Sequence, residues 1–235
     1  MPEKSIQLST TVAEIRQLAS NVKHFRFALA QPFRFSAGQF MIAHVPHEGK
    51  TVKRAYSIAS PPYESGHVEL CIQIMEGGIA STYFDQLTTG DRVTLTGPHG
   101  TFTLPQPVAY DPVFLAVGTG IAPLRSMYRQ LLHDGCERQI WSFLGVRYET
   151  DVLYDEESRA LKAAHDNFWY IPTVSRPKAW PGEVGYVQEK FKKFIPVWDH
   201  KEIFICGWTE RVKHIAADLT AYGVPTQQIH YEEWG

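Results

Sequence analysis

Three short segments of this 235-residue sequence carry residue types that bind phosphate groups. One is Gly118-Thr119-Gly120, which follows the apolar run Val113–Val117 and precedes a helical pattern. Glycines after a buried strand permit a tight turn and a close approach of phosphate to the backbone, and a helix N-terminus offers free N–H groups. The full GxGxxG pattern is absent, because Pro123 stands where its third glycine would be. The segment therefore indicates either a nucleotide phosphate site or a tight turn without a ligand.

The second segment is a glycine-rich turn at Gly77-Gly78-Ile79-Ala80-Ser81-Thr82, which opens a short helical pattern. Its two hydroxyls fall in the first turn of that helix, so the segment could form a second anion cradle. The alternative is a loop whose Ser or Thr side chain caps the helix. Two such segments in one chain favour two nucleotide-like ligands that meet between two domains.

The third segment, Arg54-Ala55-Tyr56-Ser57, combines three recognition chemistries on one strand. Arginine binds phosphate with two parallel hydrogen bonds, tyrosine offers a flat face to an aromatic ring, and serine donates a hydrogen bond. Strand alternation predicts Arg54 and Tyr56 on one face and Ser57 on the other. An ordinary strand with an exposed Arg and a core Tyr explains the same residues equally well.

Composition excludes several other classes of function. The formal net charge of −2 argues against nucleic acid as the main partner. Cys71, Cys136 and Cys206 lie far apart, so no disulfide framework, zinc site or [2Fe–2S] cluster is expected. Residues 1–20 lack the apolar core of a signal peptide, and the run Val113–Val117 is too short to span a bilayer. We expect a cytoplasmic protein with no membrane span and no metal.

The first hundred residues show six β-strand patterns, and one short helix, Ile79–Leu87, interrupts them. The strand segments are Ile6–Ala13, Val22–Leu29, Gln39–Val45, Ala55–Ala59, Val68–Met75 and Arg92–Leu95. Turn-forming residues separate them at Pro46–Gly49, Pro61–Gly66, Thr88–Asp91 and Gly97–Gly100. Short strands at this spacing predict a small antiparallel barrel.

A proline-rich stretch, Leu104–Pro112, marks a boundary, and strands and helices alternate after it. We expect domains at residues 1–106 and 107–235. The expected strands are Val113–Val117, Ile140–Gly145, Phe168–Val174, Glu202–Cys206 and Ile229–Tyr231. The expected helices are Ala122–His133, Asp155–Ala164, Tyr186–Phe194 and Thr209–Tyr222. This rhythm predicts a parallel sheet with helices on both faces, with ligands at the carboxyl ends of the strands, where Gly118, Gly145, Ser175 and Cys206-Gly207 fall.

Four motifs in register resemble the ferredoxin–NADP reductase superfamily of flavoenzymes. Arg54-Ala55-Tyr56-Ser57 is similar to its RxYS flavin motif, and Gly77-Gly78 with Ser81 is similar to its flavin-pyrophosphate motif. The run Gly118–Pro123 resembles its nicotinamide-nucleotide loop, and Cys206-Gly207 resembles its late Cys-Gly turn. The resemblance covers the chain from about Gly38 to the end.

The resemblance implies a role for each matched residue. Arg54 would pair with the flavin phosphate, Tyr56 would pack on the isoalloxazine, and Ser57 would hydrogen-bond near flavin N5. Backbone N–H groups and hydroxyls would hold the pyrophosphate at Gly77, Gly78, Ser81 and Thr82. The nicotinamide nucleotide would lie against Gly118, Thr119, Gly120, Cys206 and Gly207. Catalytic roles would fall to Ser57 and Cys206, the latter beside the nicotinamide and not as a nucleophile.

The resemblance further implies a six-stranded antiparallel flavin-binding barrel followed by a Rossmann-like parallel-sheet nucleotide-binding domain. It implies a reductase that passes hydride from NAD(P)H to bound FAD, or FMN, and then electrons to a separate ferredoxin or oxygenase component. An alternative is a flavin reductase that releases free reduced flavin. A further alternative is a non-catalytic electron-transfer subunit or redox-responsive binding module.

The choice of nicotinamide nucleotide depends on the residues after the third strand of the second domain. Ser175 and Arg176 resemble an NADP pattern, because a 2′-phosphate calls for Arg and hydroxyl donors. Arg147 offers a second phosphate partner, and the sequence favours NADPH slightly over NADH. A bare ribose would instead call for a carboxylate, and such residues are present at Asp151, Glu156 and Glu157.

Two residues near the end of the chain admit two interpretations each. Trp234 could stack on the flavin from the penultimate position, with Tyr231 as a rival, or it could close a hydrophobic edge, which we favour. Glu232 could relay a proton to a reduced flavin. Exposure of Glu232 to solvent is the favoured interpretation.

Overall fold

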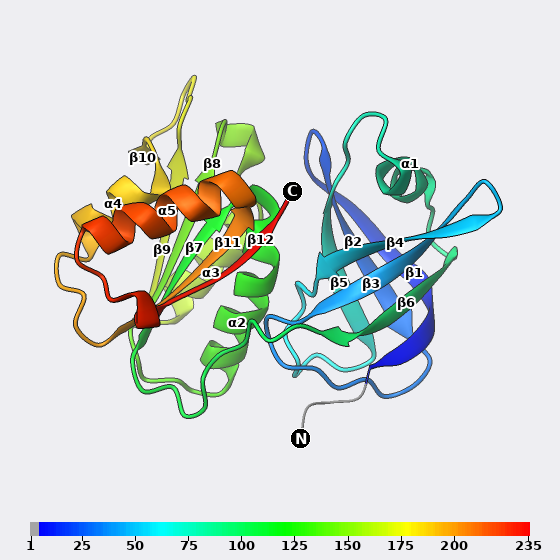
Figure 1. Cartoon of the computed structure of the whole chain (residues 1–235), viewed down its shortest axis with the longest axis horizontal. Helices are drawn as coiled ribbons and strands as arrows, with labels where there is room; N and C mark the ends of the chain where they lie inside the picture. Colours follow the sequence, from blue (N-terminus) through cyan, green and yellow to red (C-terminus); the bar gives the residue numbers. More distant parts are fainter. Residues whose placement is uncertain (1–4) are drawn as a thin grey trace.

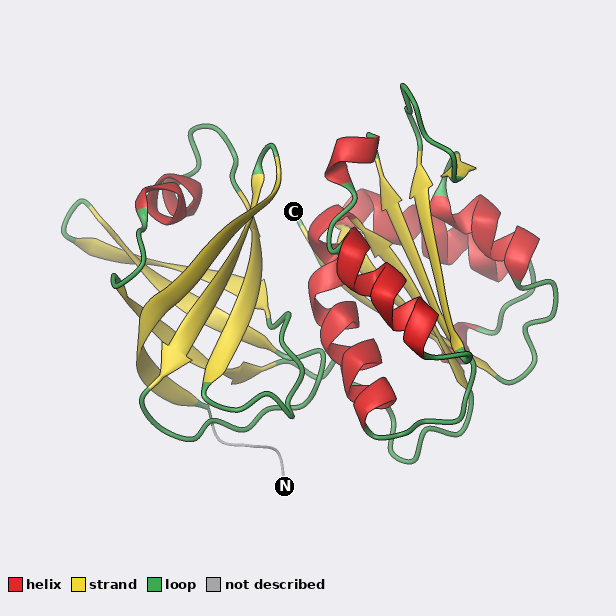
Figure 2. Ribbon diagram, turned by 180° about the vertical axis from the view of Figure 1, so that it is seen from behind, coloured by secondary structure: helices red, strands yellow, loops and turns green. Residues whose placement is uncertain are grey.

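The computed structural model describes residues 5–235 and contains two six-stranded sheets that lie next to each other (Figures 1 and 2). Residues 1–4 lie outside the described residues. The expected first domain, 1–106, and the segment 1–20 considered for a signal peptide both include these four residues. Within residues 5–235, no helix is long and apolar enough to cross a membrane. The first sheet is antiparallel and the second is parallel, which confirms the predicted fold class.

The antiparallel sheet has the strand order β4-β3-β6-β1-β2-β5. Its strands are β1 (Ile6–Ala19), β2 (Val22–Leu29), β3 (Phe40–His47), β4 (Lys50–Ser57), β5 (His67–Gln73) and β6 (Arg92–His99). An isolated antiparallel bridge between Ile58 and Leu70 joins the end of β4 to β5 and brings the two edges of the barrel together. The short helix α1 (Ile79–Gln86) follows β5 as the sequence predicts.

Alternation explains why these segments form a barrel around one core. Alternate residues of β1 from Leu8 to Val12 are buried, and each points inward because strand side chains have a period of two. The aromatic rings of Phe25, Phe27 and Phe84 complete this core, and Phe25 meets Phe84 edge to face at 5.5 Å. Helix α1 is thus anchored to the barrel through Phe84.

Several strand boundaries of the barrel differ from those expected, and the three largest differences are in β1, β4 and β6. Strand β1 continues to Ala19, β4 begins at Lys50, and β6 runs through the segment Gly97–Gly100, predicted as a turn, as far as His99. The register between β3 and β6 shifts between Phe40 and Ile42. The Gly97-Pro98 pair of β6 lies at this shift, where the regular strand pairing is interrupted. The glycine is needed there, because a Cβ on Gly97 would overlap the sulfur of Met41.

The parallel sheet has the strand order β10-β9-β8-β7-β11-β12. Its strands are β7 (Asp111–Val117), β8 (Ile140–Val146), β9 (Phe168–Val174), β10 (Glu183–Val184), β11 (Lys201–Trp208) and β12 (Ile229–Trp234). Only the two-residue β10 has no counterpart in the sequence prediction. Strand β7 is central, and the chain extends the sheet first on its β8 side and later on its β11 side, so the switch point lies between β7 and β11.

Helices cover both faces of the parallel sheet (Figure 2). They are α2 (Ile121–His133), α3 (Asp155–Ala164), α4 (Val187–Phe194) and α5 (Thr209–Ala221). Helices α4 and α5 share one core with one face of the strands, and α2 packs on the other face. Helix α2 also contacts the outside of the barrel, because Ala59, Cys71 and Phe102 belong to the same buried cluster as Met127. It is therefore one of the elements that join the two sheets.

Candidate functional site

The switch point brings two of the predicted motifs into contact. The short 3-10 turn Gly118–Gly120 follows β7 directly and leads into α2. A Cβ on Gly120 would overlap the carbonyl of Cys206 and would lie 2.9 Å from the Gly207 nitrogen. Gly120 is therefore required so that this turn can pack against the Cys-Gly turn of β11. By contrast, a Cβ on Gly118, at φ +55°, would meet no atom within 4 Å, so Gly118 faces open space.

Residues from both domains converge beside this turn. Cys206 pairs in register with Glu232 on β12, and Ser57 at the end of β4 donates its hydroxyl hydrogen to Glu232 Oε2 at 3.1 Å. Cys206 is fully buried, whereas Ser57 and Glu232 are half-buried. The C-terminus lies between the two sheets (Figure 1), which explains how β12 reaches the barrel. The expected exposure of Glu232 to solvent is thus wrong.

Burial sets the charge state of this cluster. It raises the pKa of the Cys206 thiol well above its usual range, and the carboxyl of Glu232 raises it further. Burial likewise raises the pKa of the Glu232 carboxyl, although the hydrogen bond from Ser57 opposes the rise. The thiol is therefore neutral at physiological pH, as expected for a residue that is not a nucleophile.

The glycine-rich turn before α1 has free donors. Among the residues that the structure describes, no side chain caps the N-terminus of α1, so its first-turn N–H groups have no partner in the helix. Gly77 is exposed at φ +72°, where an added Cβ would meet no atom within 4 Å, and Thr82 is exposed as well. Ser81 is buried, and its hydroxyl oxygen accepts a hydrogen bond from the Met75 nitrogen at 2.9 Å. Ser81 therefore also holds the turn in shape.

Arg54 and Tyr56 lie on β4, and Tyr56 contacts helix α1, which follows this turn. The guanidinium of Arg54 is exposed, and within residues 5–235 it donates only to the neighbouring carbonyl of Lys53, at 2.9 Å. Tyr56 meets Phe84 of α1 edge to face at 5.2 Å, and burial raises the pKa of its hydroxyl to about 12. Arg54 is thus available to an anion, and Tyr56 is held in place by α1. Ala55 between them is exposed.

The predicted nucleotide-specificity residues lie at the ends of β8 and β9. Ser175 is half-buried and donates to the Val146 carbonyl at 3.2 Å. Arg176 donates its backbone N–H to the Arg147 carbonyl at 2.8 Å, and both arginine side chains are exposed. Two of the three candidate carboxylates are already engaged, because Asp151 accepts from the Tyr148 nitrogen and Glu157 from Arg125.

Trp234 is half-buried and packs against the core cluster that α2 shares with the barrel. It pairs in register with Trp208 on β11. This position fits closure of a hydrophobic edge, and the alternative role on a flavin stays a prediction. Tyr231, the rival, is exposed.

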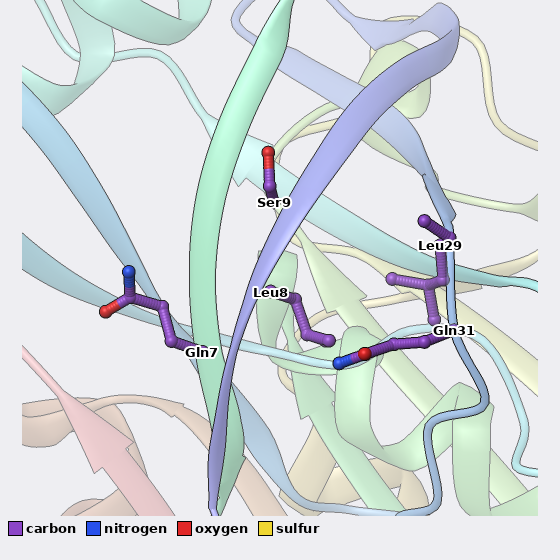
Figure 3. A pocket seen from close by; sticks show the side chains of 6 residues that line it. Gln7, Leu8, Ser9, Leu29 and Gln31 are labelled. Atoms are coloured by element: carbon purple, nitrogen blue, oxygen red, sulfur yellow. The ribbon is translucent and has the colours of Figure 1, made fainter.

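A pocket of about 210 Å³ lies elsewhere on the barrel, between β1 and the end of β2 (Figure 3). It is lined by Gln7, Leu8, Ser9, Leu29, Ala30 and Gln31. No charged side chain and no residue of the predicted motifs takes part. We assign this pocket no role in the site.

The residues present fit a flavin dinucleotide and a nicotinamide nucleotide. The uncapped helix after Gly77 and the open turn at Gly118 each offer backbone N–H groups to a phosphate. The guanidinium of Arg54 on β4 is exposed and available to an anion. Ser57 and Cys206 lie where the two sheets meet. The sequence motifs do not reveal the position of Glu232. Its hydrogen bond with Ser57 depends on contact between the two domains, and no local sequence pattern predicts that contact.

Comparisons with known proteins agree with this geometry. The oxidoreductase FAD-binding domain family matches residues 9–104, and the oxidoreductase NAD-binding domain family matches residues 114–217. Ferredoxin–NADP reductase B of Sorangium cellulosum is 36% identical over 231 residues, which are 94% of each chain. The phenol hydroxylase P5 protein of Acinetobacter pittii is 34% identical, over 95% of this chain but only 64% of its own length. The crystal structure of an Amycolatopsis cytochrome P450 reductase superimposes with a TM-score of 0.91 at 28% identity, over 97% of this chain and 70% of that one.

Proposed function

This chain belongs to the ferredoxin–NADP reductase superfamily, and from that membership we propose that it reduces a separate ferredoxin or oxygenase component. It is an NAD(P)H-dependent flavoprotein oxidoreductase that binds FAD. The two kinds of acceptor are supported by two kinds of relative, a ferredoxin–NADP reductase and the reductases of oxygenase systems. The chain spans about two thirds of the length of several oxygenase-linked relatives. Its own acceptor is therefore a proposal.

The convergence of Ser57, Glu232 and Cys206 beside the Gly118–Gly120 turn is the observation that supports the site assignment. The bound flavin and nicotinamide supply the hydride-transfer chemistry, and the protein supplies position and shielding from water. Ser57 holds a hydroxyl at the meeting point of the two sheets. Cys206 presents a neutral thiol there, and Glu232 holds a proton more tightly than an exposed carboxyl does.

We assign the remaining motif residues by location. Arg54, Tyr56 and the turn at Gly77 form the flavin side, and the turn at Gly118 forms the nicotinamide side. We also propose a domain boundary between residues 106 and 107, in the segment between β6 and β7.

The test of this function starts with the purified, desalted chain. Its visible spectrum is recorded, and NADPH or NADH is then mixed in without oxygen. A retained yellow colour that one nucleotide bleaches quickly is expected. A colourless protein that oxidises nucleotide only with added free flavin would instead indicate a flavin reductase. Bound flavin without bleaching would indicate a binding module or electron-transfer subunit.

Replacing Arg54 with alanine is expected to weaken flavin binding about 10- to 100-fold, because a charge-assisted hydrogen bond contributes roughly 1.5–3 kcal/mol. The measurement is flavin retention on gel filtration, followed by a titration of the apoprotein with FAD. Arg34→Ala on the same domain serves as the control for general loss of charge. Unchanged FAD affinity would remove Arg54 from the phosphate-binding role.

Replacing Arg176 with alanine is expected to raise the Michaelis constant for NADPH about tenfold and to leave that for NADH within about twofold. The reason is that only NADPH carries a 2′-phosphate for an exposed guanidinium to bind. Steady-state kinetics with both nucleotides measure the effect. Equal changes for the two nucleotides would contradict the 2′-phosphate assignment and the proposed preference for NADPH.

A further inference from the structure

One arginine of α2 crosses the interface between the two domains. The side chain of Arg125 is only 2% exposed, and its Nη1 donates to the Ala59 carbonyl at 2.7 Å and to Glu69 Oε2 at 2.8 Å, both in the barrel domain. On its own domain, Nε and Nη2 donate to the two oxygens of Glu157 at 2.7 and 2.6 Å. Arg125 therefore links the barrel, α2 and α3 through one rigid guanidinium.

The next residue repeats the pattern. Ser126 donates its hydroxyl hydrogen to the Ser60 carbonyl at 2.7 Å. Consecutive residues of α2 thus bond to consecutive carbonyls of the barrel, those of Ala59 and Ser60. The path between the two proposed cofactor sites is short, because Ala59 lies two residues after Ser57 and Arg125 lies five residues after Gly120.

The barrel side of this link is fixed as well. Glu69 is 1% exposed, and Arg26 of β2 donates to its other oxygen, Oε1, from Nε at 3.0 Å and from Nη2 at 2.8 Å. Its backbone nitrogen donates to Ser60 Oγ at 3.1 Å. Buried ion pairs contribute little net stability, since desolvation offsets the attraction, but their geometry is specific.

We propose that Arg125 is a positioning residue for hydride transfer, which holds the Gly118–Gly120 turn at a fixed place relative to Ser57 and the rest of β4, the strand that we assign to the flavin. This inference rests on the proposed assignment of the two cofactor sites. Reaction between two bound groups depends steeply on their separation, so that a displacement of about 1 Å can slow it about 100-fold. The hydrogen bond between Arg125 and Ala59 joins the Gly118–Gly120 turn to Ser57 through only a few residues of chain. It is therefore suited to fix the separation of the two bound groups.

The test compares Arg125→Met with Arg129→Met in the flavin-loaded protein. Arg129 is a matched control, because it lies one turn later on α2 and also forms ion pairs with the barrel, through Glu64, and with Glu157 of α3. Within residues 5–235 it makes no hydrogen bond to Ala59 or Ser60. Anaerobic stopped-flow mixing with NADPH or NADH gives the limiting rate of flavin reduction and the nucleotide dissociation constant. For Arg125→Met we expect a limiting rate at least tenfold lower, with flavin content and dissociation constant within about twofold. For Arg129→Met we expect all three within about twofold.

A second readout needs no cofactor. Hydrogen–deuterium exchange of the flavin-free protein is expected to rise in residues 118–126 for Arg125→Met and not for Arg129→Met. We expect Arg125→Met to fold, because neither carboxylate is left buried without a partner. Glu69 keeps its ion pair with Arg26, and Glu157 is partly exposed to solvent. If it does not fold, Arg125→Lys and Ser126→Ala take its place, with expected losses in limiting rate of about fivefold and about threefold.

Equal losses in the Arg125 and Arg129 variants would overturn the proposal, because they would indicate general adhesion between the domains. An unchanged limiting rate in a folded, flavin-loaded Arg125 variant would overturn it too. Failure of the proposed function is distinguishable, since it would appear in the unmodified chain as absent flavin or absent bleaching.

Discussion

Replacement of Ser57 by alanine is expected to slow the reduction of bound flavin by NAD(P)H about 100-fold, with the flavin still bound. Ser57 is the barrel residue whose hydroxyl reaches the convergence of the two domains, where it donates to Glu232 at 3.1 Å. Removing the hydroxyl takes away a positioned donor and frees the carboxyl of Glu232, and positioned proton donors contribute roughly 100-fold or more to rates. Single-turnover reduction followed at the flavin absorbance measures the effect.

Glu232→Gln and Glu233→Gln separate this role from a general loss of acid groups on β12. Glu233 is half-buried like Glu232, but its Oε1 lies 3.7 Å from Lys213 Nζ, and within residues 5–235 it makes no hydrogen bond with Ser57. We expect a fall of about tenfold or more for Glu232→Gln and little change for Glu233→Gln. Normal rates in both Ser57→Ala and Glu232→Gln would exclude the pair from the reaction.

The pH dependence of stability gives a second check on Glu232. Burial raises the pKa of its carboxyl in the folded protein above the usual value of 4.5, so the folded state holds a proton that the unfolded state has lost. This group therefore stabilises the protein fully below about pH 4.5, and that contribution is lost as pH rises through the raised pKa. In urea unfolding, the stability of the unmodified protein relative to Glu232→Gln should fall across this window. A constant difference would contradict the raised pKa.

Replacement of Gly120 by alanine is expected to abolish most hydride transfer, with a loss of at least 100-fold, and to destabilise the protein by about 1–3 kcal/mol. The added Cβ would overlap the Cys206 carbonyl, and backbone atoms on both sides leave no flexible group that can move away. The turn that we place against the nicotinamide nucleotide would have to shift. Stopped-flow reduction and thermal unfolding of the variant measure the two effects.

Gly135→Ala, at the other end of α2, is the control for this substitution. Gly135 has φ +70° with no atom within 4 Å of an added Cβ, so alanine meets backbone strain there but no overlap. We expect a loss of about 1 kcal/mol in stability and an unchanged rate of flavin reduction. A similar rate loss in both variants would show that general destabilisation, and not the contact with Cys206, explains the result.

Local patterns in the sequence were sufficient for the fold and for the position of each motif. The apolar run before Gly118 predicts β7 because a strand buried on both faces needs a continuous apolar run. Gly97 and Pro98 misled the prediction of β6, since the same residues favour a turn and a strand irregularity. Only the neighbouring strand β3 decides between them.

Contacts between the two domains could not be predicted in this way. Glu232 and Glu233 are neighbours on β12, and their side chains point to opposite faces of this short edge strand. The sequence does not show which of the two faces Ser57. Arg125 looks like the polar residue of an amphipathic helix, and its burial depends on Glu69, which is 56 residues away. A buried arginine needs its partners in place, and those partners belong to a different domain.

The strand order of the barrel has a consequence for how the chain folds during synthesis. Strands β1, β2 and β5 form one group and β3 with β4 another, and β6 lies between the groups, bonded to β1 and to β3. The pairing of Ile6 with Gly97 closes a loop of about 90 residues, which is slow to form. A nascent chain that has not yet released residues 92–99 therefore exposes the unpaired edges of two partial sheets to chaperones and to other chains. We expect this interval, rather than assembly of the parallel sheet, to limit the yield of folded protein.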